Sequence, residues 1–161
     1  MILPVQWQQQ PNEVWCWATV GSMISVYYKA QFDVGTACTP CQVATQTLPV
    51  PDCCLPDPPD ACVQPFDLQR ALAAIQHLGS SLPSDSGFDL VVGEIGAGRP
   101  LCAMIQFNGG PLHYVIVNGF DQASQQITVV NSAGSPQSLP MPFASFLAND
   151  KFSLSQWILT V

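Results

Sequence analysis

The sequence predicts an α+β fold in which an N-terminal helical part packs against a C-terminal antiparallel β-sheet. In the first half, apolar residues recur at spacings of three and four, which is typical of helices. After Gly98-Arg99-Pro100 they alternate with polar residues, which is typical of strands. Helices and strands that are segregated in this way indicate the α+β class. The length of 161 residues is ordinary for one domain, so we expect residues 1–161 to form a single domain.

The clearest helix is expected from Trp15 to Lys29, where apolar side chains recur at helical spacing. Pro11-Asn12 is a start signal, so Cys16 should lie at or near the N-terminus of this helix. The residues before it are polar and rich in Gln, and should be extended. Further helices are expected at Cys41 to Leu48, from the cap residue Asp67 through Leu78 with Gly79 closing the helix, and at Asp89 to Ile95.

The alternating segments of the second half predict strands joined by short turns. Gly109-Gly110 and Asp121 to Gln125 are the expected turns. Met141 to Phe146 is expected to form a helical turn. The expected strands are Leu101 to Phe107, His113 to Phe120, Gln126 to Val130 and Ser153 to Val161.

Charge and hydropathy exclude several classes of function. The net charge is −7 with four basic residues, so the chain offers no basic patch for the phosphates of a nucleic acid. No apolar run reaches the roughly 18 residues that a membrane span needs. The first five residues lack the basic and long apolar regions of a signal peptide. We therefore expect neither nucleic acid nor membrane as a partner.

Seven cysteines are many for this length, and the odd number leaves at least one thiol unpaired within a monomer. Cys38-x-x-Cys41 with Cys53-Cys54 partly fits the ligand spacing of a zinc site. Disulfides are favoured, because this region contains no His and because adjacent cysteines bond outward more easily than to each other. Bonds among Cys41, Cys53, Cys54 and Cys62 can follow any of three pairings.

Cys38 and Cys102 remain outside this set, and are expected either to bond to each other or to stay as buried thiols. The segment Pro49 to Pro65 is rich in Pro, Asp and Cys, and should be an ordered loop only if it is stapled. Disulfides persist in oxidising compartments. The protein is therefore expected to be secreted or extracytoplasmic.

Cys16 is the candidate nucleophile of the chain. Unpaired N–H groups at a helix N-terminus favour a thiolate and lower the pKa of a thiol placed there. The alternative is a small residue buried in a helix, since free cysteines are often buried.

His113 is the candidate base, because it lies in an expected strand directly behind the Gly109-Gly110 turn. The alternative is a core histidine with satisfied hydrogen bonds. The second histidine, His77, lies near the end of the third expected helix, where a contact with the helix C-terminus or solvent exposure explains it. Asn131 ends a strand and can hold the tautomer of an imidazole. Its alternative is a turn residue before Ala133-Gly134-Ser135-Pro136.

The order of these residues resembles that of papain-like cysteine proteases. Gln10 lies six residues before Cys16, and Cys16-Trp17-Ala18 resembles the nucleophile segment of that family. His113 behind a Gly-rich turn matches the histidine strand of the family. Asn131-Ser132-Ala133-Gly134 is similar to its Asn-Ser-Trp-Gly segment, although Ala133 replaces the tryptophan that shields the asparagine.

A compact bacterial branch, of the AvrRpt2 type, is more similar still. The shared features are Trp15-Cys16-Trp17-Ala18, the Cys41-Gln42, Cys53-Cys54 and Cys62 set, and Gly98-Arg99-Pro100 before a strand. The resemblance covers about Gln10 to Phe146. That branch often carries Asp where this chain has Asn131.

The resemblance implies a single papain-like catalytic domain and a cysteine endopeptidase that cuts proteins or peptides through a thioester. Cys16 would attack the carbonyl carbon, and His113 would form an imidazolium beside the thiolate and later protonate the leaving amine. Asn131 would orient His113. Gln10 and the backbone N–H of Cys16 would stabilise the oxyanion. No cofactor or metal is implied, and a monomer delivered outside a bacterial cell is expected.

Three alternatives stay open from the sequence. The same thioester chemistry serves thiol-dependent amidases, deamidases and transamidases. The fold also suits a non-catalytic binding module, with Trp7, Trp15 and Trp17 as an aromatic recognition face. Gln8 and Gln9 compete for the oxyanion role, which the six-residue spacing alone decides.

Overall fold

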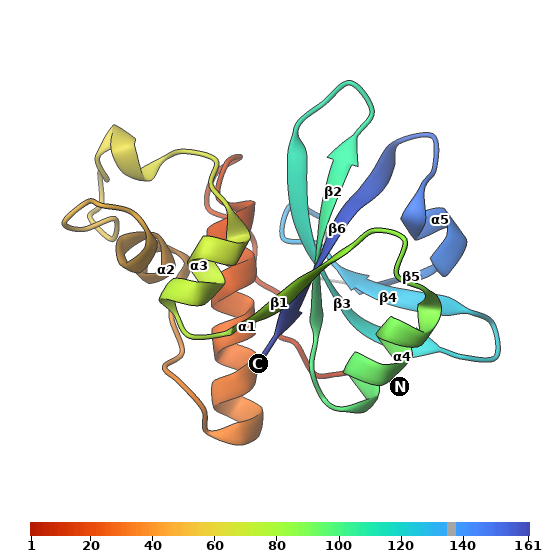
Figure 1. Ribbon diagram of the computed structural model, residues 1–161. Helices are drawn as coiled ribbons and strands as arrows, with labels where there is room; N and C mark the ends of the chain where they lie inside the picture. Colours follow the sequence, from red (N-terminus) through yellow and green to blue (C-terminus); the bar gives the residue numbers. More distant parts are fainter. Residues whose placement is uncertain (135–137) are drawn as a thin grey trace.

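The computed structural model has two parts that lie side by side, a helical part and a β-sheet (Figure 1). It describes residues 1–134 and 138–161, so Ser135-Pro136 of the expected turn after Asn131 lies outside the described residues. The helical part comes first in the chain and the sheet follows, which confirms the α+β layout. The helical part holds α1 (Cys16–Phe32), α2 (Pro40–Thr47), a 3-10 turn (Asp60–Cys62) and α3 (Leu68–Ala74).

Six strands form the sheet in the order β1-β6-β2-β3-β4-β5, and all neighbours pair in antiparallel fashion. The last strand of the chain, β6, lies between β1 and β2, so the C-terminal segment connects β1 to the rest of the sheet. The remaining elements are β1 (Leu78–Pro83), α4 (Phe88–Gly96), β2 (Leu101–Phe107), β3 (Leu112–Asp121), β4 (Gln126–Val130), β5 (Leu139–Pro142), α5 (Phe143–Leu147) and β6 (Phe152–Thr160).

Helix α1 is the centre of the core. Its side chains Trp17, Val20, Met23 and Ile24 are fully buried, and the helix packs against α2, α3 and β3. Burial of each such apolar side chain stabilises the fold by about 1.5–3 kcal/mol. Strand β3 is buried from position 113 to position 119. Core packing thus holds α1 against β3. None of the helices in the described residues has the length and apolarity that crossing a membrane requires.

Two disulfides staple the loop between α2 and α3. They join Cys41 to Cys54 and Cys53 to Cys62, so the adjacent cysteines bond outward as expected and are not zinc ligands. Cys38 and Cys102 do not bond to each other but stay as buried thiols, as does Cys16. Closing loops of this kind stabilises a fold by about 2–4 kcal/mol.

The expected helix from Asp67 through Leu78 is wrong in its second half. Asp67 is the N-cap, as expected, but α3 ends at Ala74. Gln76 then adopts a positive φ of 62°, which turns the chain away from the helix. Leu78 pairs with Thr160 in β1 instead. Gly79 closes no helix; a Cβ there would come within 3.1 Å of a β6 carbonyl oxygen, so the residue serves the close approach of two strands.

The helical turn expected from Met141 to Phe146 begins later than predicted. Met141 and Pro142 belong to β5 and pair with Ile127 and Gln126, and α5 starts at Phe143. Pro142 cannot donate a backbone hydrogen bond, which suits an edge strand such as β5. The helices expected around α1, α2 and α4 are confirmed, and so are the four expected strands.

Candidate active site

Cys16 is the first residue of α1, and no side chain caps the helix start at Trp15. The first N–H groups of a helix have no partner within the helix. Here the backbone N–H groups of Tyr114 in β3 and of Trp17 and Cys16 at the helix start lower the pKa of the Cys16 thiol. The sulfur therefore lies at the seam between the helical part and the sheet.

The ionisation of Cys16 differs from the sequence prediction. Burial raises the pKa of the Cys16 thiol, and the hydrogen bonds from the backbone N–H groups of Tyr114, Trp17 and Cys16 lower it by less. The side chain is 8% exposed, so loss of hydration disfavours a lone thiolate more than the helix start favours it. The prediction that the helix start lowers this pKa is wrong as a net effect.

The two tryptophans beside Cys16 tie the helix start to the stapled loop. Trp15 Nε1 donates to the carbonyl oxygen of Cys62 at 2.7 Å, and Trp17 Nε1 donates to that of Gln64 at 3.0 Å. Both side chains are buried, so neither belongs to an exposed recognition face, and of the three tryptophans expected there only Trp7 is partly exposed. In this structure they hold the loop against the start of α1.

His113 lies near the start of β3, in the part of the strand that is not paired with β4. The pairing of β3 with β4 ends at Ile116 and Val130, so the earlier residues of β3 have no β4 partner among the described residues. Asn131 follows directly after β4, and its Oδ1 lies 2.9 Å from His113 Nε2. The end of β4 thus delivers the asparagine to the histidine, as the sequence predicted.

The orientation of the Asn131 amide follows from a second contact. The backbone N–H of Ala133 donates to Asn131 Oδ1 at 2.9 Å, so the atom facing the histidine is the oxygen. His113 Nε2 therefore donates the bond, and Nδ1 is the nitrogen left to act as a base. Burial lowers the pKa of His113, and the bond to Asn131 raises it by less.

Cys16 and His113 do not hydrogen-bond to each other in this structure, and within the described part of the chain Nδ1 has no partner. Catalytic contacts are often long in the absence of substrate and shorten when it binds. The sulfur nonetheless lies near the start of β3, because Cys16 lines one cavity with Tyr114, the residue next to His113, and the backbone N–H of Tyr114 lowers the pKa of the thiol.

Gln10 is the one of the three neighbouring glutamines that contacts the segment after β4. Its backbone N–H donates to the carbonyl oxygen of Ser132 at 3.0 Å, and its Oε1 accepts a bond from Ser132 Oγ at 3.0 Å. Gln8 is turned to the other side, where its Oε1 accepts from Ser22 Oγ of α1 at 2.8 Å. Gln9 is exposed. The three glutamines that competed for the oxyanion role thus have different surroundings, and only Gln10 contacts Ser132.

The sequence did not indicate the positions of two residues at this site. Ser132 belongs to the motif of Asn131 but has no expected role, and Trp7 was expected only in an aromatic recognition face. Trp7 donates from Nε1 to the carbonyl oxygen of Asn131 at 2.9 Å, across 124 positions in the chain. Such a contact leaves no local pattern, so a single sequence cannot indicate it.

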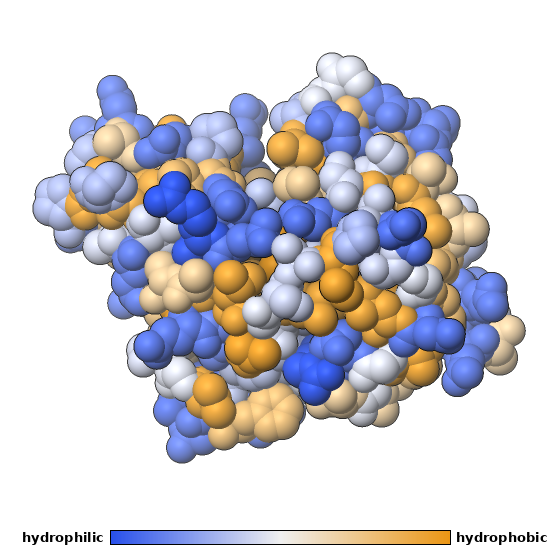
Figure 2. Space-filling view, viewed as in Figure 1, coloured by the Kyte–Doolittle hydropathy of each residue, from blue (hydrophilic) through white to orange (hydrophobic). Residues whose placement is uncertain are grey.

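A cavity of about 320 Å³ opens beside Cys16. It lies between the start of α1, the loop before α3 and the start of β3, and Figure 2 shows the surface notched between the two parts. A peptide side chain can be held there next to the sulfur. Its lining residues are Val14, Cys16, Trp17, Pro65, Phe66, Asp67, Leu112 and Tyr114.

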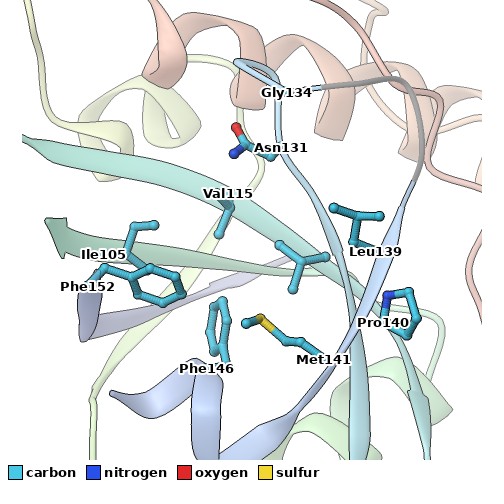
Figure 3. Close-up of a pocket in the computed structure, with 10 residues that line it drawn as sticks. Ile105, Val115, Asn131, Gly134, Leu139, Pro140, Met141, Phe146 and Phe152 are labelled. Atoms are coloured by element: carbon cyan, nitrogen blue, oxygen red, sulfur yellow. The ribbon is translucent and has the colours of Figure 1, made fainter. Parts of the chain in front are cut away.

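A second cavity of about 300 Å³ lies on the other side of Asn131 (Figure 3). Its walls are apolar, with Ile105, Val115, Phe146 and Phe152 among them, and Asn131 stands at one end. Cys16 does not line it, so the cavity beside Cys16 is the candidate substrate site.

His77 takes no part in this arrangement. It lies beyond the end of α3 and is fully buried, so the expected solvent exposure is wrong. Its Nδ1 is 2.8 Å from the carbonyl oxygen of Val161, and its ring stacks on Tyr28 with 4.9 Å between centroids. It packs the C-terminal strand onto α1.

Comparison with one solved structure supports the fold. A protein described as a C39-like peptidase, from Bacillus anthracis, superposes with a TM-score of 0.59 at 16% identity, over 99% of this chain and 96% of its own. Xylellain, a cysteine protease from Xylella fastidiosa, has a TM-score of 0.48 at 14% identity, over 97% of this chain and 82% of its own. No curated protein matches the sequence. The model of the Peptidase_C39 like family matches residues 2–155, so the chain belongs to this family of cysteine peptidases.

Proposed function

We propose that this cysteine peptidase is an endopeptidase that uses Cys16, His113 and Asn131 as a triad, with Gln10 as an oxyanion donor. The observation that carries the proposal is the position of the Cys16 sulfur. The backbone N–H of Tyr114 lowers the pKa of this thiol, which places the sulfur near the start of β3, and the neighbouring residue His113 is held by Asn131, with 2.9 Å between Nε2 and Oδ1. Cys16 lines the candidate substrate cavity together with Leu112 and Tyr114, the two residues on either side of His113 in the chain.

The proposed reaction begins with both groups neutral. Burial raises the pKa of Cys16 and lowers the pKa of His113. Both shifts favour the uncharged form, so a lone thiolate and a lone imidazolium are disfavoured. The proton of the Cys16 thiol passes to His113 Nδ1 as the sulfur attacks the substrate carbonyl carbon. The positive imidazolium and the negative charge that develops then stabilise each other, which offsets the cost of burial.

The later steps use the same groups. The carbonyl oxygen becomes an oxyanion, which the backbone N–H of Cys16 and the side-chain amide of Gln10 stabilise. His113 returns its proton to the leaving amine, and the C–N bond breaks to give a thioester on Cys16. His113 then takes a proton from water, whose oxygen attacks the thioester and frees the acid and the thiol.

The substrates of such an enzyme are proteins or peptides, and the cavity beside Cys16 receives a side chain close to the bond that is cut. The two disulfides favour an oxidising environment, so we infer that the enzyme acts outside the cytoplasm.

An unfolded protein substrate tests the proposal. The wild type should release internal fragments, and the near-isosteric variant Cys16→Ser should leave the substrate intact, with new termini identified by mass spectrometry. Reductant is kept low, so that the two disulfides survive. Intact substrate in both reactions, or equal cleavage in both, would contradict the proposal. Loss of single terminal residues alone would replace the endopeptidase with an exopeptidase.

A further inference from the structure

The carboxamide of Gln10 is held at both ends. Its Nε2 donates to the carbonyl oxygen of Asn12 at 2.9 Å, and its Oε1 accepts from Ser132 Oγ at 3.0 Å. The backbone N–H of Gln10 also donates to the carbonyl oxygen of Ser132 at 3.0 Å. Ser132 therefore contacts both the main chain and the side chain of Gln10.

These contacts fix which end of the amide is which. The carbonyl oxygen of Asn12 can only accept, so the group facing it must be the NH₂ of Gln10. The hydroxyl of Ser132 donates to the other end, which must be the oxygen. One N–H of the NH₂ group is used by Asn12, and the second has no partner within the described residues. That second N–H is free to donate a hydrogen bond to an oxyanion.

Ser132 is also the neighbour of Asn131 in the chain. It is fully buried, whereas the Asn131 amide next to it binds His113 Nε2 at 2.9 Å. Two adjacent residues after β4 thus contact two different groups of the proposed site, His113 and Gln10. Asn131 orients the base, and Ser132 contacts the oxyanion donor.

We propose that Ser132 is a positioning residue, whose hydroxyl keeps the Gln10 carboxamide with an N–H directed at the developing oxyanion. This inference rests on the proposed function. Without the hydroxyl, Gln10 Oε1 loses its donor and the carboxamide is held only through the bond from Nε2 to Asn12, so its second N–H is less firmly directed at a negative charge. The donor matters most in the transition state, so its loss lowers kcat more than it changes KM.

The experiment compares Ser132→Ala, Gln10→Ala and the double variant with the wild type, on one fluorogenic peptide that the wild type cleaves. Loss of an oxyanion donor lowers kcat by about 10²–10³-fold, so we expect Gln10→Ala in that range and Ser132→Ala at about tenfold or more. The double variant should be no slower than Gln10→Ala, because Ser132 acts through Gln10. Ser132→Thr, which keeps a hydroxyl, should retain more activity than Ser132→Ala.

Alkylation of Cys16 by iodoacetamide supplies the control, since it forms no oxyanion. Its rate should be the same in Ser132→Ala as in the wild type, and the melting temperature shows that the variant is folded. Multiplicative loss in the double variant, or an unchanged kcat in Ser132→Ala, would overturn the role of Ser132 while the endopeptidase stands. Equal peptide cleavage by wild type and Cys16→Ser would instead overturn the proposed function, and this inference with it.

Discussion

The helical wall of the site, which carries Cys16, is anchored to a loop closed by two disulfides. The sheet wall, which carries His113, is held by strand register and by hydrogen bonds to residues more than 100 positions away. Trp15 and Trp17 connect the first wall to the carbonyl oxygens of Cys62 and Gln64. On the second wall, Trp7 contacts Asn131 across 124 positions.

This difference assigns different sensitivities to the two walls. A reductant or a cysteine substitution acts on the loop that lines the substrate cavity. A change at the N-terminal segment or after β4 acts on His113 and Gln10, the proposed base and oxyanion donor. Binding and chemistry should therefore be separable by mutation, although both walls meet within one site.

The largest effect is expected for His113→Gln, a variant of similar size that cannot act as the base. We expect kcat to fall by about 10³-fold or more, because the thiol then has no group to take its proton. Steady-state kinetics on a peptide substrate measures this. A loss smaller than about tenfold would show that another group accepts the proton.

The disulfide between Cys53 and Cys62 is expected to stabilise the helical wall. Removing it with Cys53→Ala and Cys62→Ala together should lower the free energy of unfolding by about 2–4 kcal/mol, as measured by denaturant titration. KM should rise, because Trp15 loses a fixed partner at Cys62. Replacing Cys41 and Cys54 by Ala is the matched control, with a similar loss of stability and a smaller change in KM.

The orienting bond of the sheet wall is tested by Asn131→Ala. Because His113 then rotates more freely and loses a bond that favours its charged form, kcat should fall by about 10–100-fold with little change in KM. An unchanged kcat would mean that packing alone orients the imidazole. A large rise in KM without loss of kcat would contradict the separation of the two walls.

The smallest effect concerns the acid limb of the pH profile. Burial lowers the pKa of His113 from its ordinary value of 6.5, so the imidazole stays neutral and able to accept a proton at mildly acidic pH. Activity should therefore fall only below pH 6.5, as His113 becomes protonated. Asn131→Asp adds a negative charge that favours imidazolium, so the limb should move to higher pH. A limb above pH 6.5 in the wild type would contradict this assignment.

Local sequence patterns predicted several of the elements and candidate residues. The spacing of Gln10 and Cys16, and the setting of His113 and Asn131, indicated the candidate residues, and the structure joins His113 to Asn131 and Gln10 to Ser132 by hydrogen bonds. Local patterns also indicated α1 and most strands. They failed after Ala74, where pairing with β6 overrides helical periodicity.

Burial and distant contacts were the parts that the sequence could not supply. The raised pKa of Cys16 depends on how closely β3 and α1 pack, which no local motif encodes. The disulfide pairing depends on the path of the loop, and the partners of Trp7 and Ser132 depend on the position of β4. Each of these is a property of tertiary structure.

The central claim is that Cys16 and His113 act as one unit, and the rate at which iodoacetamide alkylates Cys16 tests it most directly. The label is assigned to Cys16 by peptide mapping, because Cys38 and Cys102 are also free thiols. At mildly acidic pH the wild type should react at least about tenfold faster than His113→Gln, since His113 accepts the thiol proton. Equal rates in the two proteins would contradict the claim.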